Sequence, residues 1–184
     1  MKTHPFARRR LLRQGAGLAA ATALPLLALP ARASVPAARA LAMAHTHTRE
    51  RIELVYAVAQ DYLPEALGTL NHFLRDHYSG EVGRMDPPLF DVLHGLRQLL
   101  GHSGPFEIIS GYRCPATNEK LRARGGGGVA KKSLHMEGRA VDIRLPGVPL
   151  DELRDAAISL RAGGVGYYAE SRFVHVDTGR VRSW

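Results

Sequence analysis

The sequence predicts a small α+β domain, with a central antiparallel sheet and flanking helices. Three observations support this fold class. The chain has 184 residues, 45% of them hydrophobic and 23% charged, which is enough to bury one core but hardly two. Short segments with alternating apolar residues indicate strands, whereas longer segments with apolar residues every three or four positions indicate helices. Glycine and proline separate these segments at intervals that suit one compact unit.

Residues 1–33 are predicted to be an export signal outside this domain. Arg8-Arg9-Arg10 precede a weakly hydrophobic run, and Ala31-Arg32-Ala33 fits the small-residue pattern cut by signal peptidase. Consecutive arginines before such a run are typical of the twin-arginine route, which predicts a periplasmic protein. The run contains Pro25 and is shorter than the roughly 20 residues that span a bilayer. We therefore expect no stable membrane insertion after cleavage; an uncleaved interfacial anchor is the alternative.

The formal net charge of +8 is concentrated in this leader. Residues 1–33 hold six of the 25 lysines and arginines and no acid, so 19 basic residues face 17 acidic ones in the remainder. A nucleic-acid-binding function is disfavoured by this near balance. Cys114 is the single cysteine, so the chain has no internal disulfide. Because no motif of a cysteine peptidase flanks Cys114, we interpret it as a packed structural residue.

The domain itself is expected to occupy residues 41–184, after a linker at 34–40. Alternation in 51–56 predicts a hairpin across the His-Thr-His-Thr segment at 45–48. Pro64 is expected to open a helix that ends near Ser79-Gly80.

The following elements are predicted from the same signals. Asp86-Pro87 is expected to cap and start a second helix, whose apolar residues recur at helical spacing as far as Leu100. The remaining expectations are a strand at 106–110, a short helix after Pro115, a flexible connection at 125–128, a helix capped by Asp151 and ended by Gly163-Gly164, and a closing hairpin that begins at 165–168.

Two of the predicted strands carry polar side chains that suit a metal ion. In 139–145 the apolar residues share one strand face and Asp142 lies on the other, and in 173–177 His175 lies opposite the valines. An aspartate within an apolar strand is costly unless it has a partner. His135 precedes the first of these strands.

Zinc accepts imidazole nitrogen and carboxylate oxygen, and a catalytic zinc site takes three protein ligands and keeps a fourth position for water. His135, Asp142 and His175 are therefore predicted to bind one zinc ion per chain. The alternative is that they are a loop histidine, a strand-end aspartate and a hydrogen-bonded histidine with separate structural roles.

Several sequence blocks, in the same order, are also found together in one family. They are Leu-Arg-Asp-His at 74–77, Ile-Ser-Gly-Tyr-Arg at 109–113, Val-Ala-Lys-Lys-Ser-Leu-His-Met at 129–136, Gly-Gly-Val-Gly-Tyr-Tyr at 163–168 and Phe-Val-His-Val-Asp-Thr-Gly at 173–179. With these blocks the chain resembles the murein endopeptidase K (YcbK-like) family, which is related to zinc D-Ala-D-Ala carboxypeptidases and L-alanyl-D-glutamate peptidases. The resemblance extends upstream through residues 45–50.

This resemblance implies an exported zinc metallopeptidase that hydrolyses the peptide cross-links of peptidoglycan during cell-wall remodelling, with the peptide stems as its partners. It leaves open which bond is cut, whether the enzyme is an endopeptidase or a carboxypeptidase, and the oligomeric state. The alternative function is a non-catalytic peptidoglycan-binding module that holds a structural metal.

Three further residues are candidates for the chemistry. A general base must take the proton of the attacking water. Asp177, on the same strand face as His175, is the first candidate and Glu170 is the second. Asp177 could instead orient a ligand imidazole. The acid or histidine that relatives carry just before the second ligand histidine is absent here. By resemblance, Arg113 would stabilise the oxyanion; a structural salt bridge is its alternative role.

Residues around the predicted ligands have less definite roles. Ser133 is a candidate to bind a substrate carboxylate, and Lys131 and Lys132 are candidates to attract anionic stems; a hydrogen bond to the loop and solvated charges are the alternatives. His45 and His47 share a strand face, but no third ligand is evident, so surface or hydrogen-bonding roles are expected.

Three aromatic residues near the end of the chain have two interpretations. They could line a substrate groove or pack in the core, and the sequence does not separate these roles: Tyr167, Tyr168 and Trp184.

Overall fold

The computed structural model describes residues 37–124 and 129–184, and all structural statements below concern these residues. The predicted leader, the first part of the predicted linker and the expected glycine connection at 125–128 lie outside them. In the part of the chain that is described, no helix has the length and apolar character needed to cross a membrane.

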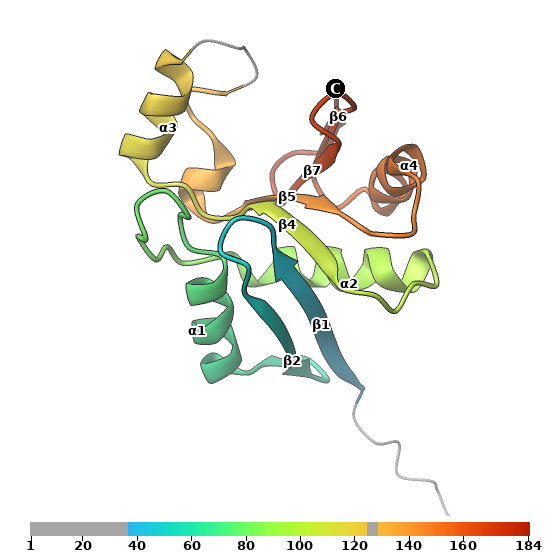
Figure 1. Cartoon of the computed structure of the whole chain (residues 1–184). Helices are drawn as coiled ribbons and strands as arrows, with labels where there is room; N and C mark the ends of the chain where they lie inside the picture. The colour runs from blue at the N-terminus through green and yellow to red at the C-terminus, as the bar shows by residue number, and fades with distance from the viewer. Residues whose placement is uncertain (1–36, 125–128) are drawn as a thin grey trace, which may run out of the picture. The chain divides into compact units, whose positions relative to one another are not determined.

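Eight strands form one sheet. They are β1 (Ala38–His45), β2 (Arg51–Val58), β3 (Asp61–Tyr62), β4 (Phe106–Ser110), β5 (Ala140–Arg144), β6 (Gly164–Tyr168), β7 (Phe173–Asp177) and β8 (Arg182–Ser183). Their order across the sheet is β3-β2-β1-β4-β5-β7-β6-β8 (Figure 1). The predicted α+β class is confirmed.

The sheet is mixed rather than antiparallel throughout, which corrects the prediction. The pairs β1–β4 and β6–β8 are parallel, and the other neighbours are antiparallel. Alternation of apolar residues shows which face of a strand is buried, but it carries no information on the direction of a distant partner strand. The strand 106–110 and the hairpin across 45–48 are confirmed. Because β1 begins at Ala38, three residues of the predicted linker belong to the sheet.

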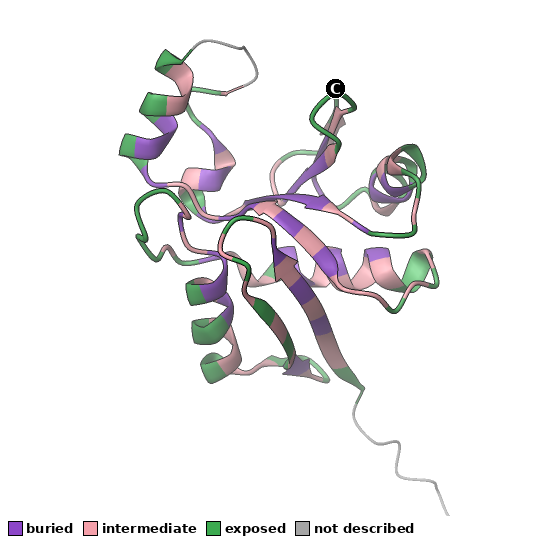
Figure 2. Cartoon of the chain, viewed as in Figure 1, coloured by how far each residue is buried: buried purple, intermediate pink, exposed green. Residues whose placement is uncertain are grey.

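Four α-helices and one short 3₁₀ helix accompany the sheet. They are α1 (Pro64–Phe73), α2 (Pro87–Leu99), α3 (Pro115–Ala123), the 3₁₀ helix η1 (Leu134–Glu137) and α4 (Leu150–Leu160). Helices α1, α2 and α4 bury their apolar sides against one face of the sheet, as the purple stripes in Figure 2 show. The core includes Leu70, Phe73, Leu89, Leu93, Leu96, Leu153, Phe106, Ile108, Val141, Ile143, Val174 and Val176. The side chains that alternate with the core residues of β5 and β7 therefore point to the other face.

Helix α1 ends at Phe73, six residues before the predicted end at Ser79. The carbonyl of Leu74 accepts a hydrogen bond from the backbone N–H of Tyr112, 2.7 Å away. The buried carboxylate of Asp76 accepts the backbone N–H groups of Tyr78 and Cys114, each at 2.9 Å. Such side-chain bonds offer the backbone an alternative to helical hydrogen bonds. Here they end helix α1 at Phe73.

Two predicted helix caps differ from the structure. Asp86 occupies the N-cap position of α2 as expected, but it makes no capping hydrogen bond; the hydroxyl of Thr178 donates to its carboxylate instead. Pro149 is the N-cap of α4, so Asp151 lies in the first turn rather than at the cap. A carboxylate there still favours the positive end of the helix dipole.

Gly138 lets the chain pass close to a neighbouring loop between η1 and β5. Its φ is +67°, and a Cβ atom at this position would lie 2.0 Å from the carbonyl oxygen of Arg84. We expect Gly138→Ala to lower the free energy of unfolding by about 1–2 kcal/mol from backbone strain and by about 1–3 kcal/mol more from the forced displacement of that loop. Urea denaturation measures both contributions together.

A matched control for this change is Gly80→Ala. Gly80 has a φ of +78°, but nothing lies within 4 Å of the added Cβ, so only the backbone strain is expected. Equal losses of stability in the two variants would show that the loop at Arg84 yields freely, contrary to this expectation.

Candidate metal centre

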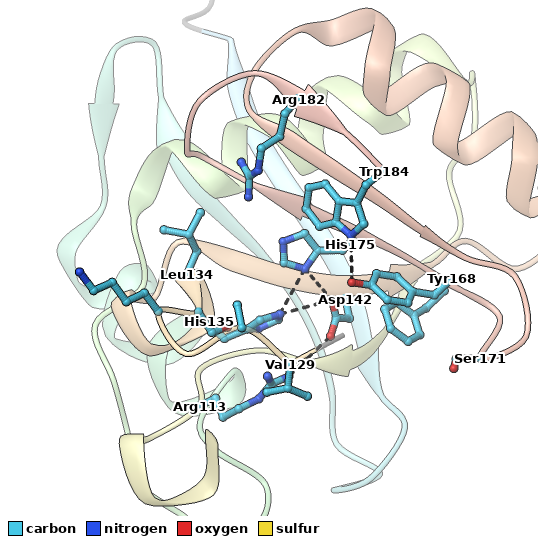
Figure 3. Close-up of a pocket in the computed structure, with 14 residues that line it drawn as sticks. Arg113, Val129, Leu134, His135, Asp142, Tyr168, Ser171, His175, Arg182 and Trp184 are labelled. Atoms are coloured by element: carbon cyan, nitrogen blue, oxygen red, sulfur yellow. Dashed lines mark hydrogen bonds and ion pairs between the residues drawn. The ribbon is translucent and has the colours of Figure 1, made fainter. Parts of the chain in front are cut away.

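The three predicted ligands meet on the face of the sheet that is not covered by α1, α2 and α4 (Figure 3). His135 comes from η1, Asp142 from β5 and His175 from β7, and the last two are direct partners across the β5–β7 ladder. Their exposed fractions are 3%, 6% and 8%. Among the described residues they are the only group of three or more His, Cys, Asp or Glu whose ligand atoms all lie within 4.8 Å of one another.

The converging atoms are His135 Nε2, Asp142 Oδ1 and His175 Nδ1. His135 Nε2 lies 3.3 Å from each of the other two atoms, and the remaining pair is 2.9 Å apart. Ligands placed tetrahedrally at 2.0–2.1 Å from a zinc ion are separated by about 3.3 Å. Two imidazoles and one carboxylate at these separations fit a single divalent metal ion.

Each imidazole is oriented by a hydrogen bond on its outer nitrogen. His135 Nδ1 donates to the carbonyl oxygen of Gly111 at 2.7 Å, because a carbonyl can only accept. His175 Nε2 donates to the carboxylate of Asp177 at 3.2 Å. The lone pair of the other nitrogen of each ring is thereby directed toward the centre of the group, the arrangement that metal-ligating histidines usually show.

The electrostatics of the group favour a positive charge at its centre. Burial lowers the pKa of His175, but hydrogen bonds and charge from Asp142 and Asp177 outweigh burial and raise that pKa to about 9. Burial raises the pKa of Asp142, yet His135 and His175 hold it well below its usual range. A divalent cation bound between these residues would supply the same positive charge.

Asp177 lies behind His175, away from the converging atoms. It is 1% exposed, and its Oδ1 accepts the backbone N–H groups of Gly164 and Gly179 at 2.9 and 2.8 Å. Its Oδ2 accepts from Arg182 at 2.7 Å and from His175. Although burial opposes ionisation, these bonds hold the pKa of Asp177 well below its usual range. Both carboxylate oxygens are thus occupied by partners within the protein.

Arg113 and Glu170 lie in different surroundings. The guanidinium of Arg113 lines the pocket in which the group lies, 3.8 Å from Asp142 Oδ2, and donates to Ser110 Oγ at 3.3 Å. Glu170 is exposed and is not among the pocket-lining residues, although its neighbour Ser171 is. Of the three candidates for the chemistry, only Arg113 therefore borders the pocket.

The pocket has a volume of about 260 Å³ and one aromatic wall. Trp184 and Tyr168 belong to this wall, and the indole Nε1 donates to the hydroxyl of Tyr168 at 3.0 Å (Figure 3). The indole ring lies 5.4 Å from the ring of His175. Tyr167 instead packs against the core beside Arg154. Tyr168 and Trp184 thus line the pocket, whereas Tyr167 packs against the core.

Arg182 is a site residue that the sequence analysis did not identify. It bonds both oxygens of Asp177, and its guanidinium lies 4.8 Å from the centre of the Trp184 ring. No local pattern marks this arginine, because its position depends on the parallel pairing of β8 with β6.

Cys114 lies outside the pocket, buried at the start of α3, where its sulfur accepts the backbone N–H of Thr117 at 3.5 Å. This location agrees with the interpretation of a packed structural cysteine. Ser133 and Lys132 line the pocket, whereas Lys131 does not.

His45 and His47 form a separate cluster with His77, which lies in the turn after α1. His45 Nδ1 accepts the backbone N–H groups of His47 and Thr48 at 3.2 and 3.4 Å, so its proton is on Nε2. That nitrogen is then unavailable to a metal. Burial and neighbouring imidazoles lower the pKa of His45 and of His77 to about 4. The geometry suits a neutral, packed cluster.

The chain is similar to known proteins over nearly its whole length. A family model described as the peptidoglycan L,D-endopeptidase MepK matches residues 33–184. The peptidoglycan L,D-endopeptidase MepK of Escherichia coli strain K12 is 46% identical over 177 residues, 96% of each chain. The probable enzyme of this name from Haemophilus influenzae is 41% identical over 155 residues, 84% of this chain and 83% of the relative. No solved structure matches significantly.

The family model covers all the described elements and all the residues of the candidate metal centre. The identities extend over nearly the whole chain rather than over isolated motifs. The resemblance inferred from the sequence blocks is thus confirmed, and the chain belongs to the MepK family of peptidoglycan L,D-endopeptidases.

Proposed function

We propose that the protein is an exported zinc metallopeptidase that hydrolyses the cross-links between the peptide stems of peptidoglycan. The observation that carries this proposal is the convergence of His135, Asp142 and His175 in a pocket bordered by Arg113. The group has three members among the residues described, and a catalytic zinc site has three protein ligands, whereas a structural site usually has four. This count favours the enzyme over the binding module.

The name of the family indicates which type of cross-link is hydrolysed. A link from D-alanine to diaminopimelate joins two D centres. A link between two diaminopimelates joins the carbonyl of an L centre to the amine of a D centre. The relatives are L,D-endopeptidases by name, and we propose that this chain likewise cuts the diaminopimelate–diaminopimelate link.

The residues of the site have separable roles in this reaction. When bound, zinc would polarise the scissile carbonyl and make water nucleophilic near neutral pH. Gly111 and Asp177 keep the two imidazoles in the orientation that the metal needs. Arg113 lies on the pocket wall beside Asp142, where a fixed cation stabilises negative charge that develops on the carbonyl oxygen.

We propose Asp177 as a positioning residue rather than the general base, because its two oxygens already bind four donors inside the protein. Glu170 is the remaining candidate for the base. It is exposed, and Ser171 next to it lines the pocket.

Asp177→Asn should weaken zinc binding about 10- to 100-fold, because the amide orients His175 less well than a carboxylate does. Turnover at saturating zinc should stay close to that of the unmodified protein. Competition with a chromophoric chelator measures the affinity, and Asp155→Asn, at an exposed carboxylate on α4, is the control. If turnover were lost while zinc stayed bound, Asp177 would be the base after all.

The site of action follows from the substrate. Peptidoglycan lies outside the cytoplasm, so we propose that residues 1–33 direct the protein to the periplasm by the twin-arginine route. Amino-terminal sequencing of the periplasmic form should find a start at Ser34.

The proposed function is tested by digestion of purified cross-linked peptidoglycan with the protein from Ser34 onward, with added zinc and with a chelator. Mass spectrometry of the released muropeptides should show that diaminopimelate–diaminopimelate dimers disappear and that the chelator prevents this. Loss of D-alanine–diaminopimelate dimers instead would contradict the proposed bond. Dimers that stay intact with stoichiometric zinc would support the binding module.

A further inference from the structure

The pocket around the metal centre has an uneven charge. Fourteen of the described residues line it. Among these fourteen, Arg113, Lys132 and Arg182 are cationic, whereas Asp142 is the only acid. Asp142 is itself one of the candidate metal ligands. A substrate in this pocket therefore meets an excess of positive charge, which attracts anionic groups.

The three cations differ in their partners. Arg182 is paired with Asp177 at 2.7 Å. Arg113 bonds Ser110 and lies near Asp142. In the part of the chain that is described, no ion pair involves Lys132, whose side chain is exposed. Of the three pocket cations, Lys132 is thus the one for which the described residues provide no ion-pair partner.

The residues that follow Lys132 in the chain place it close to the candidate metal centre. The next residue, Ser133, is buried in the pocket wall, and His135 follows two positions later. The same short segment thus carries a candidate metal ligand, His135, and the unpaired cation Lys132. Lys131, one position earlier and equally exposed, does not line the pocket.

We propose that Lys132 is a specificity-determining residue that binds a substrate carboxylate beside the scissile amide. This inference rests on the proposed function, because that function identifies the carboxylate. In a link between two diaminopimelates, the carbon that bears the departing amine also bears a free carboxylate. An ammonium donates charge-assisted hydrogen bonds to such a group. Lys132 selects links that carry this charge over links in which it is masked as an amide.

The test compares two synthetic cross-link peptides that are identical except for a carboxylate or a carboxamide at this position. The zinc-loaded protein should cleave the carboxylate peptide with a KM about fivefold lower, the upper range for an exposed ion pair. Lys132→Met should abolish this preference with little change in kcat, and Lys132→Arg should retain it. Lys131→Met is the matched control and should behave like the unmodified protein. Added salt should reduce the preference.

A binding measurement separates this inference from the proposed function. Trp184 is the only tryptophan in the chain and lines the pocket, so its fluorescence reports occupancy without turnover. In the metal-free protein, the carboxylate peptide should bind more tightly than the carboxamide peptide. In the Lys132→Met variant, the two peptides should bind with equal affinity.

The outcomes distinguish the two ideas. If neither peptide is cleaved but tighter binding of the carboxylate form depends on Lys132, the peptidase proposal fails and the carboxylate subsite stands. If both peptides are cleaved and bound equally with or without Lys132, the subsite is overturned and the peptidase stands. An equal effect of Lys131→Met would also overturn the subsite, because it would show only diffuse attraction.

Discussion

Zinc binding and peptidoglycan hydrolysis are both expected to disappear in the His175→Ala variant. His175 supplies one of the three converging ligand atoms found among the described residues, and its removal leaves Asp142 and Asp177 buried without the imidazole that now bonds both. Without the metal, the attacking water would lose the cation that lowers its pKa and would no longer be a good nucleophile near neutral pH. We therefore expect turnover to fall by more than about 1000-fold, to background.

Metal analysis of the purified variant should find less than one tenth of the zinc of the unmodified protein. His72→Ala, at an exposed histidine of α1, is the control and should retain both zinc and activity. Circular dichroism excludes a folding defect as the cause. If the folded His175→Ala variant kept stoichiometric zinc, the assignment of this ligand would be wrong.

Arg113→Ala is expected to keep zinc but to lose about 100- to 1000-fold in kcat, the usual effect of removing one oxyanion donor. The guanidinium borders the pocket and lies near Asp142, but it supplies no atom to the converging group. Arg113→Lys should recover only part of the rate, because an ammonium is a point charge without the planar fork of arginine.

Steady-state kinetics and zinc analysis together test this role of Arg113. Arg122→Ala, on the neighbouring helix α3, removes a partly exposed cation that does not line the pocket and should have no effect on kcat. A kcat close to normal in Arg113→Ala, with lower stability, would indicate the structural salt bridge that the sequence analysis left as the alternative.

The convergence of the three candidate ligands could be predicted from the sequence because its signals are local. Strand alternation alone places Asp142 and His175 opposite the apolar residues of their strands, and the structure pairs those strands directly. The helix α2 was predicted for the same reason, since its apolar stripe and its proline start lie within one segment.

The features that the sequence analysis missed depend on contacts between distant segments. The parallel pairing of β1 with β4 joins residues about 60 positions apart, and nothing within either strand indicates its direction. Helix α1 stops early because Tyr112 and Cys114 bind the chain that follows it. Likewise, Arg182 reaches Asp177 only through the pairing of β8 with β6.

The direct pairing of Asp142 with His175 across β5 and β7 has a consequence for how such a chain can change in length. Because side chains alternate, one residue inserted within either strand would turn every following side chain to the opposite face. A ligand beyond the insertion would then enter the core, and a core valine would face the substrate. In related sequences, insertions and deletions should therefore occur in the connections at 145–149 and 169–172. Strands β5 and β7 should differ by substitutions alone.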